Sequence, residues 1–231
     1  MKRIHALLGV QSIVAILVSI NRLGTWTLGF VLPNEFLRWV DFNNMLVLPL
    51  ISVVASYLLK KTLEYDAPQK EGKSHITWNL VFIIGLYLLA ASYGNHEVTN
   101  YLHQRFCEAD ATSDLCRIVI FNDDEFSHWI FFIGFVLVNL AILFIQKLFP
   151  HQGQMTTVDY ALLGLNALFL GAGVFANLGF EEIGLDLYVV ALLAFTSVYV
   201  LWRHGRQPMF VYYTIAYLLG LFGSLIAQVL R

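Results

Sequence analysis

The chain has 231 residues, a formal net charge of −2 and 13% charged residues, about half the share typical of soluble domains. With 58% hydrophobic residues and a mean hydropathy of +0.67, its composition is that of a membrane protein. The near-zero net charge excludes nucleic-acid binding through bulk positive charge. We therefore expect membrane lipid as the partner and no nucleic acid.

Apolar stretches follow one another along the chain, separated by short polar segments. We count seven of them, over residues 5–20, 44–59, 77–94, 128–148, 158–180, 185–202 and 208–230. A membrane-spanning helix needs roughly 20 mainly apolar residues, and unbroken runs without strand alternation favour helices over a barrel. The sequence predicts an all-α fold, a polytopic transmembrane bundle of about seven helices, with residues 1–231 forming a single integral membrane domain.

Two segments near the N-terminus do not fit a plain spanning helix. Residues 23–40 are aromatic and are interrupted by Pro33, Asn34 and Glu35, which predicts an interfacial segment, with a re-entrant one as the alternative. The chain begins with two basic residues before an apolar run, as a signal peptide does, but no small-x-small cleavage site follows. We therefore expect an uncleaved first helix.

Lysine and arginine in the loops predict the orientation, because cytoplasmic loops are enriched in both. With the N-terminus inside, the cytoplasmic side holds nine basic residues: Lys2, Arg3, Lys60, Lys61, Lys70, Lys73, Lys147, Arg203 and Arg206. The outer side holds five: Arg22, Arg38, Arg105, Arg117 and Arg231. We expect an integral membrane protein, in a bacterial inner membrane, with a cytoplasmic N-terminus and an outer C-terminus.

The two cysteines, Cys107 and Cys116, both fall in the outer loop predicted between the third and fourth helices. That compartment is oxidising, so the spacing favours a disulfide. Two free thiols, or thiolates that bind a metal, remain alternatives.

Polar residues at helical spacing extend the third predicted helix beyond its apolar part. Ser92, His96, Asn100 and His103 are spaced four, four and three residues apart, which places them along one stripe of a helix. Glu97 lies about 100° from His96 around the helix and flanks the same face. Ionisable residues at a membrane boundary are costly to desolvate, so the stripe is a candidate functional site.

The start of the fourth predicted helix carries a matching set. Asp124 lies four residues before His128, and Glu125 lies three before it, so either carboxylate can share a helix face with that histidine. A loop of about twenty residues joins the two segments, which favours antiparallel packing. We expect His96, His103 and His128 to meet one of these carboxylates below the outer interface.

Neutral imidazoles with one carboxylate suit zinc or another divalent transition metal. We assign His96, His103 and His128 as candidate metal ligands, and Asp124, Glu125 and Ser92 as candidate catalytic residues. Asn100 would orient a ligand or contact substrate. One Glu-x-x-His is visible where di-iron bundles use two, so mononuclear zinc is favoured over di-iron. The alternative is a polar network that ties helices together.

The fifth predicted helix ends with further polar residues. Asn166, Asn177 and Glu181 fall roughly on one face, and Glu181 reaches the same outer boundary. It would complete the metal coordination or act as a general base; otherwise it belongs to a solvated loop. The remaining histidines, His5, His75, His151 and His204, lie at predicted cytoplasmic ends, where we expect them to be solvated.

At these residues the chain resembles a group of poorly characterised polytopic bacterial membrane proteins. Their pattern of Tyr-Gly, His-x3-Asn-x2-His and Asp-Glu-x2-His corresponds here to Tyr93-Gly94, His96-x3-Asn100-x2-His103 and Asp124-Glu125-x2-His128.

A weaker resemblance is to the seven-helix metal-hydrolase superfamily of alkaline ceramidases and adiponectin receptors. Ser92-x3-His96 and Asp124 match its Ser-x3-His and its later Asp. The last helix here lacks that superfamily's His-x3-His, so His103 and His128 would have to replace the pair. The resemblance implies a seven-helix fold and a zinc site that hydrolyses a lipid.

Three functions are compatible with these patterns. The favoured one is a membrane-embedded metal-dependent hydrolase, with zinc as cofactor, acting on a lipid-like substrate near the outer interface. A metal or proton transporter or sensor would use the same cluster and a polar route past Asn139, Asn166 and Asn177. A structural membrane protein would use the cluster only for packing.

Overall fold

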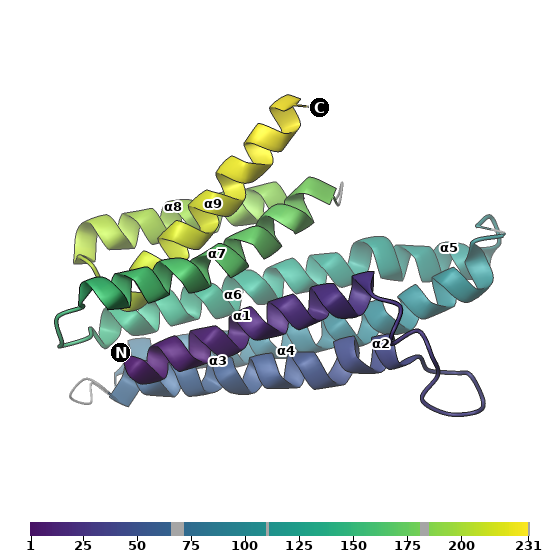
Figure 1. Ribbon diagram of the computed structural model, residues 1–231, viewed down its shortest axis with the longest axis horizontal. Coiled ribbons are helices and arrows are strands. Elements are labelled where there is room, and N and C mark those ends of the chain that lie inside the picture. Colours follow the sequence, from purple (N-terminus) through teal and green to yellow (C-terminus); the bar gives the residue numbers. More distant parts are fainter. Residues whose placement is uncertain (66–71, 110, 181–184, 231) are drawn as a thin grey trace.

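The computed structural model describes residues 1–65, 72–109, 111–180 and 185–230, and within them seven helices are long and apolar enough to cross a membrane (Figure 1). The helices include α1 (Lys2–Leu23), α3 (Leu48–Tyr65), α4 (Lys73–Leu102), α6 (Ser127–Leu148), α7 (Thr157–Phe180), α8 (Leu185–His204) and α9 (Pro208–Leu230). The predicted all-α membrane fold is confirmed at this level.

Shorter elements lengthen three of these helices at one end of the bundle. They are α2 (Trp39–Phe42) and the π-helical turn η1 (Asn43–Val47) before α3, the π-helical turn η2 (His103–Cys107) after α4, and α5 (Asp114–Ile120) with the π-helical turn η3 (Phe121–Phe126) before α6. We call this the site end of the bundle. The end that holds Met1 is the N-terminal end, on the left in Figure 1.

Residues 24–38 form a loop at the site end, where the sequence predicts an interfacial segment. An isolated antiparallel bridge joins Phe30 to Arg38, so the loop folds back on itself. Trp26 and Phe36 are 94% and 72% exposed. Large exposed aromatic side chains at a membrane boundary are typical of an interfacial segment rather than a buried re-entrant one.

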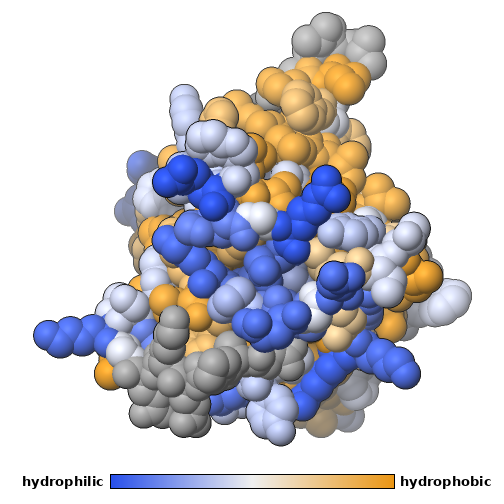
Figure 2. Space-filling view, turned by 90° about the vertical axis from the view of Figure 1, so that its left-hand side faces the viewer, coloured by the Kyte–Doolittle hydropathy of each residue, from blue (hydrophilic) through white to orange (hydrophobic). Residues whose placement is uncertain are grey.

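One buried apolar cluster contains residues from every one of the seven long helices, from Ile4 and Leu8 on α1 to Met209 and Tyr217 on α9. Charged residues gather at the N-terminal end, whose surface is largely hydrophilic (Figure 2). This arrangement, with an apolar middle and polar ends, is the one expected of helices that satisfy their backbone groups internally within lipid.

Candidate metal centre

Helices α4 and α6 run antiparallel, and their backbones touch below the site. A Cβ atom at Gly85 would lie 2.9 Å from the backbone nitrogen of Val138, and one at Gly134 would lie 2.9 Å from the carbonyl oxygen of Gly85. Such close contact needs glycine on both helices. Toward the site, Ser92 lies seven residues after Gly85 and Ser127 lies seven residues before Gly134. Ser92 donates a hydrogen bond to the carbonyl of Ser127 at 2.8 Å.

The same register, continued four residues further along each helix, brings His96 to Asp123. The Nδ1 atom of His96 lies 3.0 Å from Oδ1 of Asp123. The close approach of the glycines thus fixes the distance between the two helices at which the polar residues meet.

Asp123 is central because it lies in the π-helical turn η3. In a π-helix, residues five apart share a face, whereas an α-helix aligns residues four apart. Asp123 and His128 are five apart, so the π-turn puts both of them toward α4. The side chain of Asn95 donates to the carbonyl of Asn122 at 2.9 Å, and Ser127 donates to the carbonyl of Asp123 at 2.6 Å, which holds the turn in place.

Both carboxylate oxygens of Asp123 face histidines, and the side chain is almost fully buried, with the residue 1% exposed. Nδ1 of His103 lies 3.0 Å from Oδ2, and Asn100 donates to the same oxygen at 3.4 Å. The His96 contact to Oδ1 is not aligned as a hydrogen bond, and neither atom has another hydrogen-bond partner among the described residues.

His128 joins the cluster through His96. The two imidazole rings are 5.0 Å apart between centroids and are tilted by 52°. One turn deeper, Tyr93 and Phe131 make an edge-to-face contact at 5.8 Å. At the site end of the α4–α6 pair, the polar residues therefore form one layer, and aromatic residues form the next layer toward the middle of the bundle.

The three predicted histidines do not converge on one point. Among the described residues, one group of three or more His, Cys, Asp or Glu has donor atoms all within 4.8 Å of one another: His103, Asp123 and Asp124. His96 and His103 are seven residues apart, which is about 10 Å along the helix axis, so they lie against opposite oxygens of Asp123. Asp124 is at the edge of the group, 3.9 Å from His103.

The cluster lies just beyond the apolar length of α6. That helix has 22 residues, about 33 Å of rise, which matches a hydrocarbon core about 30 Å thick. Asp123 precedes the helix by one turn and therefore lies at the level of the headgroups. His96 and His103 have side chains that are 20% and 27% exposed, so the site is open to solvent at its edge.

Three predicted site residues have other roles. Ser92 lies one turn deeper than His96 and is engaged with the Ser127 carbonyl, so it ties α4 to α6. Glu97 faces the opposite side of α4 and pairs with Arg22 at 2.5 Å. Glu125 is exposed at the surface, because the π-turn directs Asp123 rather than its neighbours into the site. The carboxylate at the centre is therefore Asp123, and not Asp124 or Glu125.

The remaining polar candidates lie apart from the cluster or outside the described residues. Glu181 lies outside them, as does the side chain of Asn177. Asn139 donates to the carbonyl of Phe135 in its own helix, and Asn166 accepts from Ser12 and donates to the carbonyl of Leu162. These amides are used in packing, and none of their hydrogen bonds outlines a route across the bundle.

Cys107 and Cys116 form a disulfide, with nine residues of separation. It joins the end of η2 to α5 and packs with Val119, Leu102 and Ile120. The bond fastens together the extensions of α4 and α6 that carry His103 and Asp123. Both sulfurs are used in this bond, which leaves no cysteine thiolate as a metal ligand.

Comparisons of the chain with protein-family models, with curated proteins and with solved structures gave no significant match.

Proposed function

We propose that the chain is a membrane-embedded, metal-dependent hydrolase, with zinc as the favoured ion, that acts on a lipid-like substrate. The observation that carries the proposal is the buried carboxylate of Asp123, which faces an imidazole nitrogen at 3.0 Å on each oxygen. Within the described residues, no lysine or arginine comes within ion-pair distance of it.

A buried carboxylate without a compensating cation is costly. A neutral imidazole contributes no positive charge, so the charge of Asp123 needs a proton or a metal ion. Two ligand atoms at about 2.1 Å from one ion stand about 3.0–3.4 Å apart for angles between 90° and 109°. The 3.0 Å contact of His103 with Asp123 fits that spacing, and imidazole combined with carboxylate favours zinc among common ions.

The ion would be held by His103, Asp123 and Asp124, whose donor atoms all lie within 4.8 Å of one another. Three protein ligands leave a position for water, as in catalytic zinc sites, and zinc lowers the pKa of bound water to about 7. His96 lies across the carboxylate with His128 beside it. His96 would serve as the general base of the site. The headgroup depth of the cluster favours an amphipathic substrate with its scissile bond at the interface.

Metal content tests this proposal. We expect about one zinc per chain in protein purified in mild detergent without chelators, and its loss in Asp123→Asn. The matched control is Asp114→Asn, because Asp114 is a carboxylate at the same end with a side chain 98% exposed; this variant should keep the zinc. A folded protein without metal, or equal metal in both variants, would favour a structural hydrogen-bond network. Once the metal is shown, the reaction is tested with ester- and amide-linked lipids. We expect the wild type to hydrolyse such a lipid and His96→Gln to lose this activity.

A further inference from the structure

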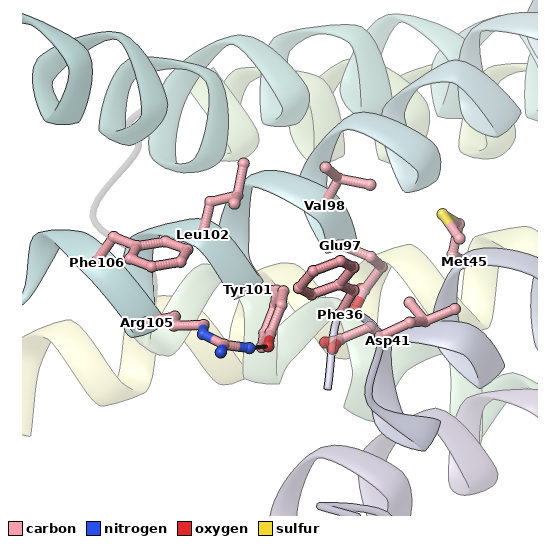
Figure 3. Close-up of a pocket in the computed structure, with 10 residues that line it drawn as sticks. Phe36, Asp41, Met45, Glu97, Val98, Tyr101, Leu102, Arg105 and Phe106 are labelled. Carbon is pink, nitrogen blue, oxygen red and sulfur yellow. Dashed lines mark hydrogen bonds between the residues drawn. The ribbon is translucent and has the colours of Figure 1, made fainter. Parts of the chain in front are cut away.

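A cavity of about 290 Å³ lies between α4 with η2 on one side and the segment from Phe36 to Met45 on the other (Figure 3). Its walls are mostly apolar or aromatic: Phe36, Leu37, Met45, Val98, Tyr101, Leu102 and Phe106. Three charged residues also line it: Asp41, Glu97 and Arg105.

Both carboxylates at the cavity already have an arginine partner. Glu97, 2% exposed, accepts from Arg22 at 2.5 Å. Asp41, also 2% exposed, accepts from Arg38 with both oxygens, at 2.7 and 2.8 Å. The bidentate pair of Arg38 with Asp41 and the single contact of Arg22 with Glu97 balance the two buried negative charges. The remaining charged group of the lining is Arg105, so the cavity carries one positive charge in excess.

Arg105 is placed to hold a ligand at the rim of the cavity. Its side chain points to Tyr101 in Figure 3, and Nη1 donates to the Tyr101 hydroxyl and to the carbonyl of Glu35. Within the described part of the chain, both of these hydrogen bonds of Arg105 use Nη1. A guanidinium carries five donors in a planar fork, so Nε and Nη2 remain available to an oxyanion.

The apolar walls continue onto the surface that faces the bilayer. Val98 and Phe106 are 47% and 61% exposed, and Leu46 and Leu50, which precede and begin the neighbouring spanning helix, are 50% and 63% exposed. A hydrocarbon chain that leaves the cavity along this surface stays in contact with apolar side chains. The cavity reaches headgroup depth, because Arg105 lies in η2, beyond the end of α4 that carries His96.

We propose that this cavity binds an anionic phospholipid of the surrounding bilayer, with its phosphate on Arg105 and an acyl chain between Val98, Leu102 and Phe106. Basic side chains near the membrane surface attract anionic lipids, and the apolar walls add the burial of the chain. This site is separate from the metal centre and does not depend on it.

Native mass spectrometry of delipidated protein tests the proposal, with phosphatidylglycerol and phosphatidylcholine of identical acyl chains as the probes. We expect the wild type to prefer phosphatidylglycerol by about fivefold, since one basic residue near the surface contributes about 1 kcal/mol. Arg105→Gln should abolish the preference, whereas Arg105→Lys should keep most of it. The matched control is Arg117→Gln, an arginine at the same end whose side chain is 73% exposed, and it should behave as the wild type.

A steric variant tests the acyl-chain part. Val98→Trp fills the cavity mouth and should weaken both lipids, whereas Val54→Trp, at a residue also 47% exposed but on α3 outside the cavity, should weaken neither. Asp123→Asn should bind both lipids as the wild type does, so failure of the metal proposal leaves this one standing. Equal binding of the two lipids by the wild type, or equal loss in Arg105→Gln and Arg117→Gln, would overturn the proposal.

Discussion

The two ends of the bundle both hold a histidine against a carboxylate, yet the carboxylates have different surroundings. At the N-terminal end, Glu64 lies 2.8 Å from His75, and it also contacts Lys60 at 2.5 Å and Lys61 at 3.2 Å. At the site end, Asp123 has two imidazole nitrogens at 3.0 Å and, among the described residues, no lysine or arginine at ion-pair distance. The lysine partners, rather than the histidine contact itself, distinguish Glu64 from Asp123.

A second pair at the N-terminal end is stabilised by a helix terminus rather than by a lysine. His5 lies 2.8 Å from Asp159, and the other oxygen of Asp159 accepts from the backbone nitrogen and the hydroxyl of Thr156, both at 2.8 Å. Thr156 immediately precedes α7, so the two residues form a capping box. The helix terminus stabilises this negative charge. Our expectation that His5 and His75 would be solvated is wrong, because both pair with carboxylates.

Replacing each carboxylate by its amide should give the largest difference in stability between the two ends. Glu64→Gln leaves Lys60, which is 4% exposed, without its partner, and loss of one member of a buried pair costs about 3–5 kcal/mol. Asp123→Asn in metal-free protein leaves neutral imidazoles and should cost about 1 kcal/mol. Unfolding in detergent measures both. If both variants lower the unfolding free energy of the metal-free protein by the same amount, Asp123 would belong to a structural ion pair as well.

The disulfide should contribute the next largest effect. It closes a loop with nine residues of separation, and cross-links of that size stabilise by about 2–4 kcal/mol through the unfolded chain. Cys107→Ser combined with Cys116→Ser should lower the unfolding free energy by that amount and weaken zinc binding, because η2 and α5 are no longer fastened. Unchanged zinc affinity in the double variant would show that the α4–α6 contact alone sets the site.

Disruption of the glycine contact below the site should cost less stability than loss of the disulfide. Gly134→Ala places a Cβ atom 2.9 Å from the α4 backbone, and overpacking of this kind costs about 1–3 kcal/mol. Because the helices must separate, zinc affinity should fall as well. The control is Gly94→Ala on α4, where a Cβ meets no atom within 4 Å and helix propensity favours alanine by up to about 1 kcal/mol. Equal zinc affinity in the two variants would show that the spacing of α4 and α6 does not determine the geometry of the site.

The sequence was sufficient to predict the number of spanning helices, because twenty-residue apolar runs are the strongest signal that a membrane imposes. The sequence also predicted that His96 and His103 lie on one stripe and pack against the start of the following helix. It did not single out Asp123 as the buried carboxylate between the histidines, because α-helical spacing favours Asp124 and the chain forms a π-turn in which Asp123 faces inward. The five-residue spacing of Asp123 and His128 is visible in the sequence. It places both on one face only if a π-turn forms, and the residue types alone do not predict a π-turn.

Glu97 shows a second limit of sequence analysis. Its position 100° from His96 was compatible with either side of α4, and the outcome depended on Arg22, a residue 75 positions away. Pairings of that kind arise from tertiary packing, which no spacing rule along one helix contains. The cavity behind Glu97 was likewise out of reach, since its walls come from two segments far apart in the sequence.

The most direct test of the central claim is zinc-edge X-ray absorption on the purified protein. The account predicts nitrogen and oxygen ligands at about 2.0–2.2 Å, including imidazole scattering that decreases in His103→Gln and is unchanged in His75→Gln. The contrast between these two histidines compares the two ends of the bundle within one measurement. Sulfur at about 2.3 Å, or an imidazole signal equally present in both variants, would contradict a metal centre built on Asp123.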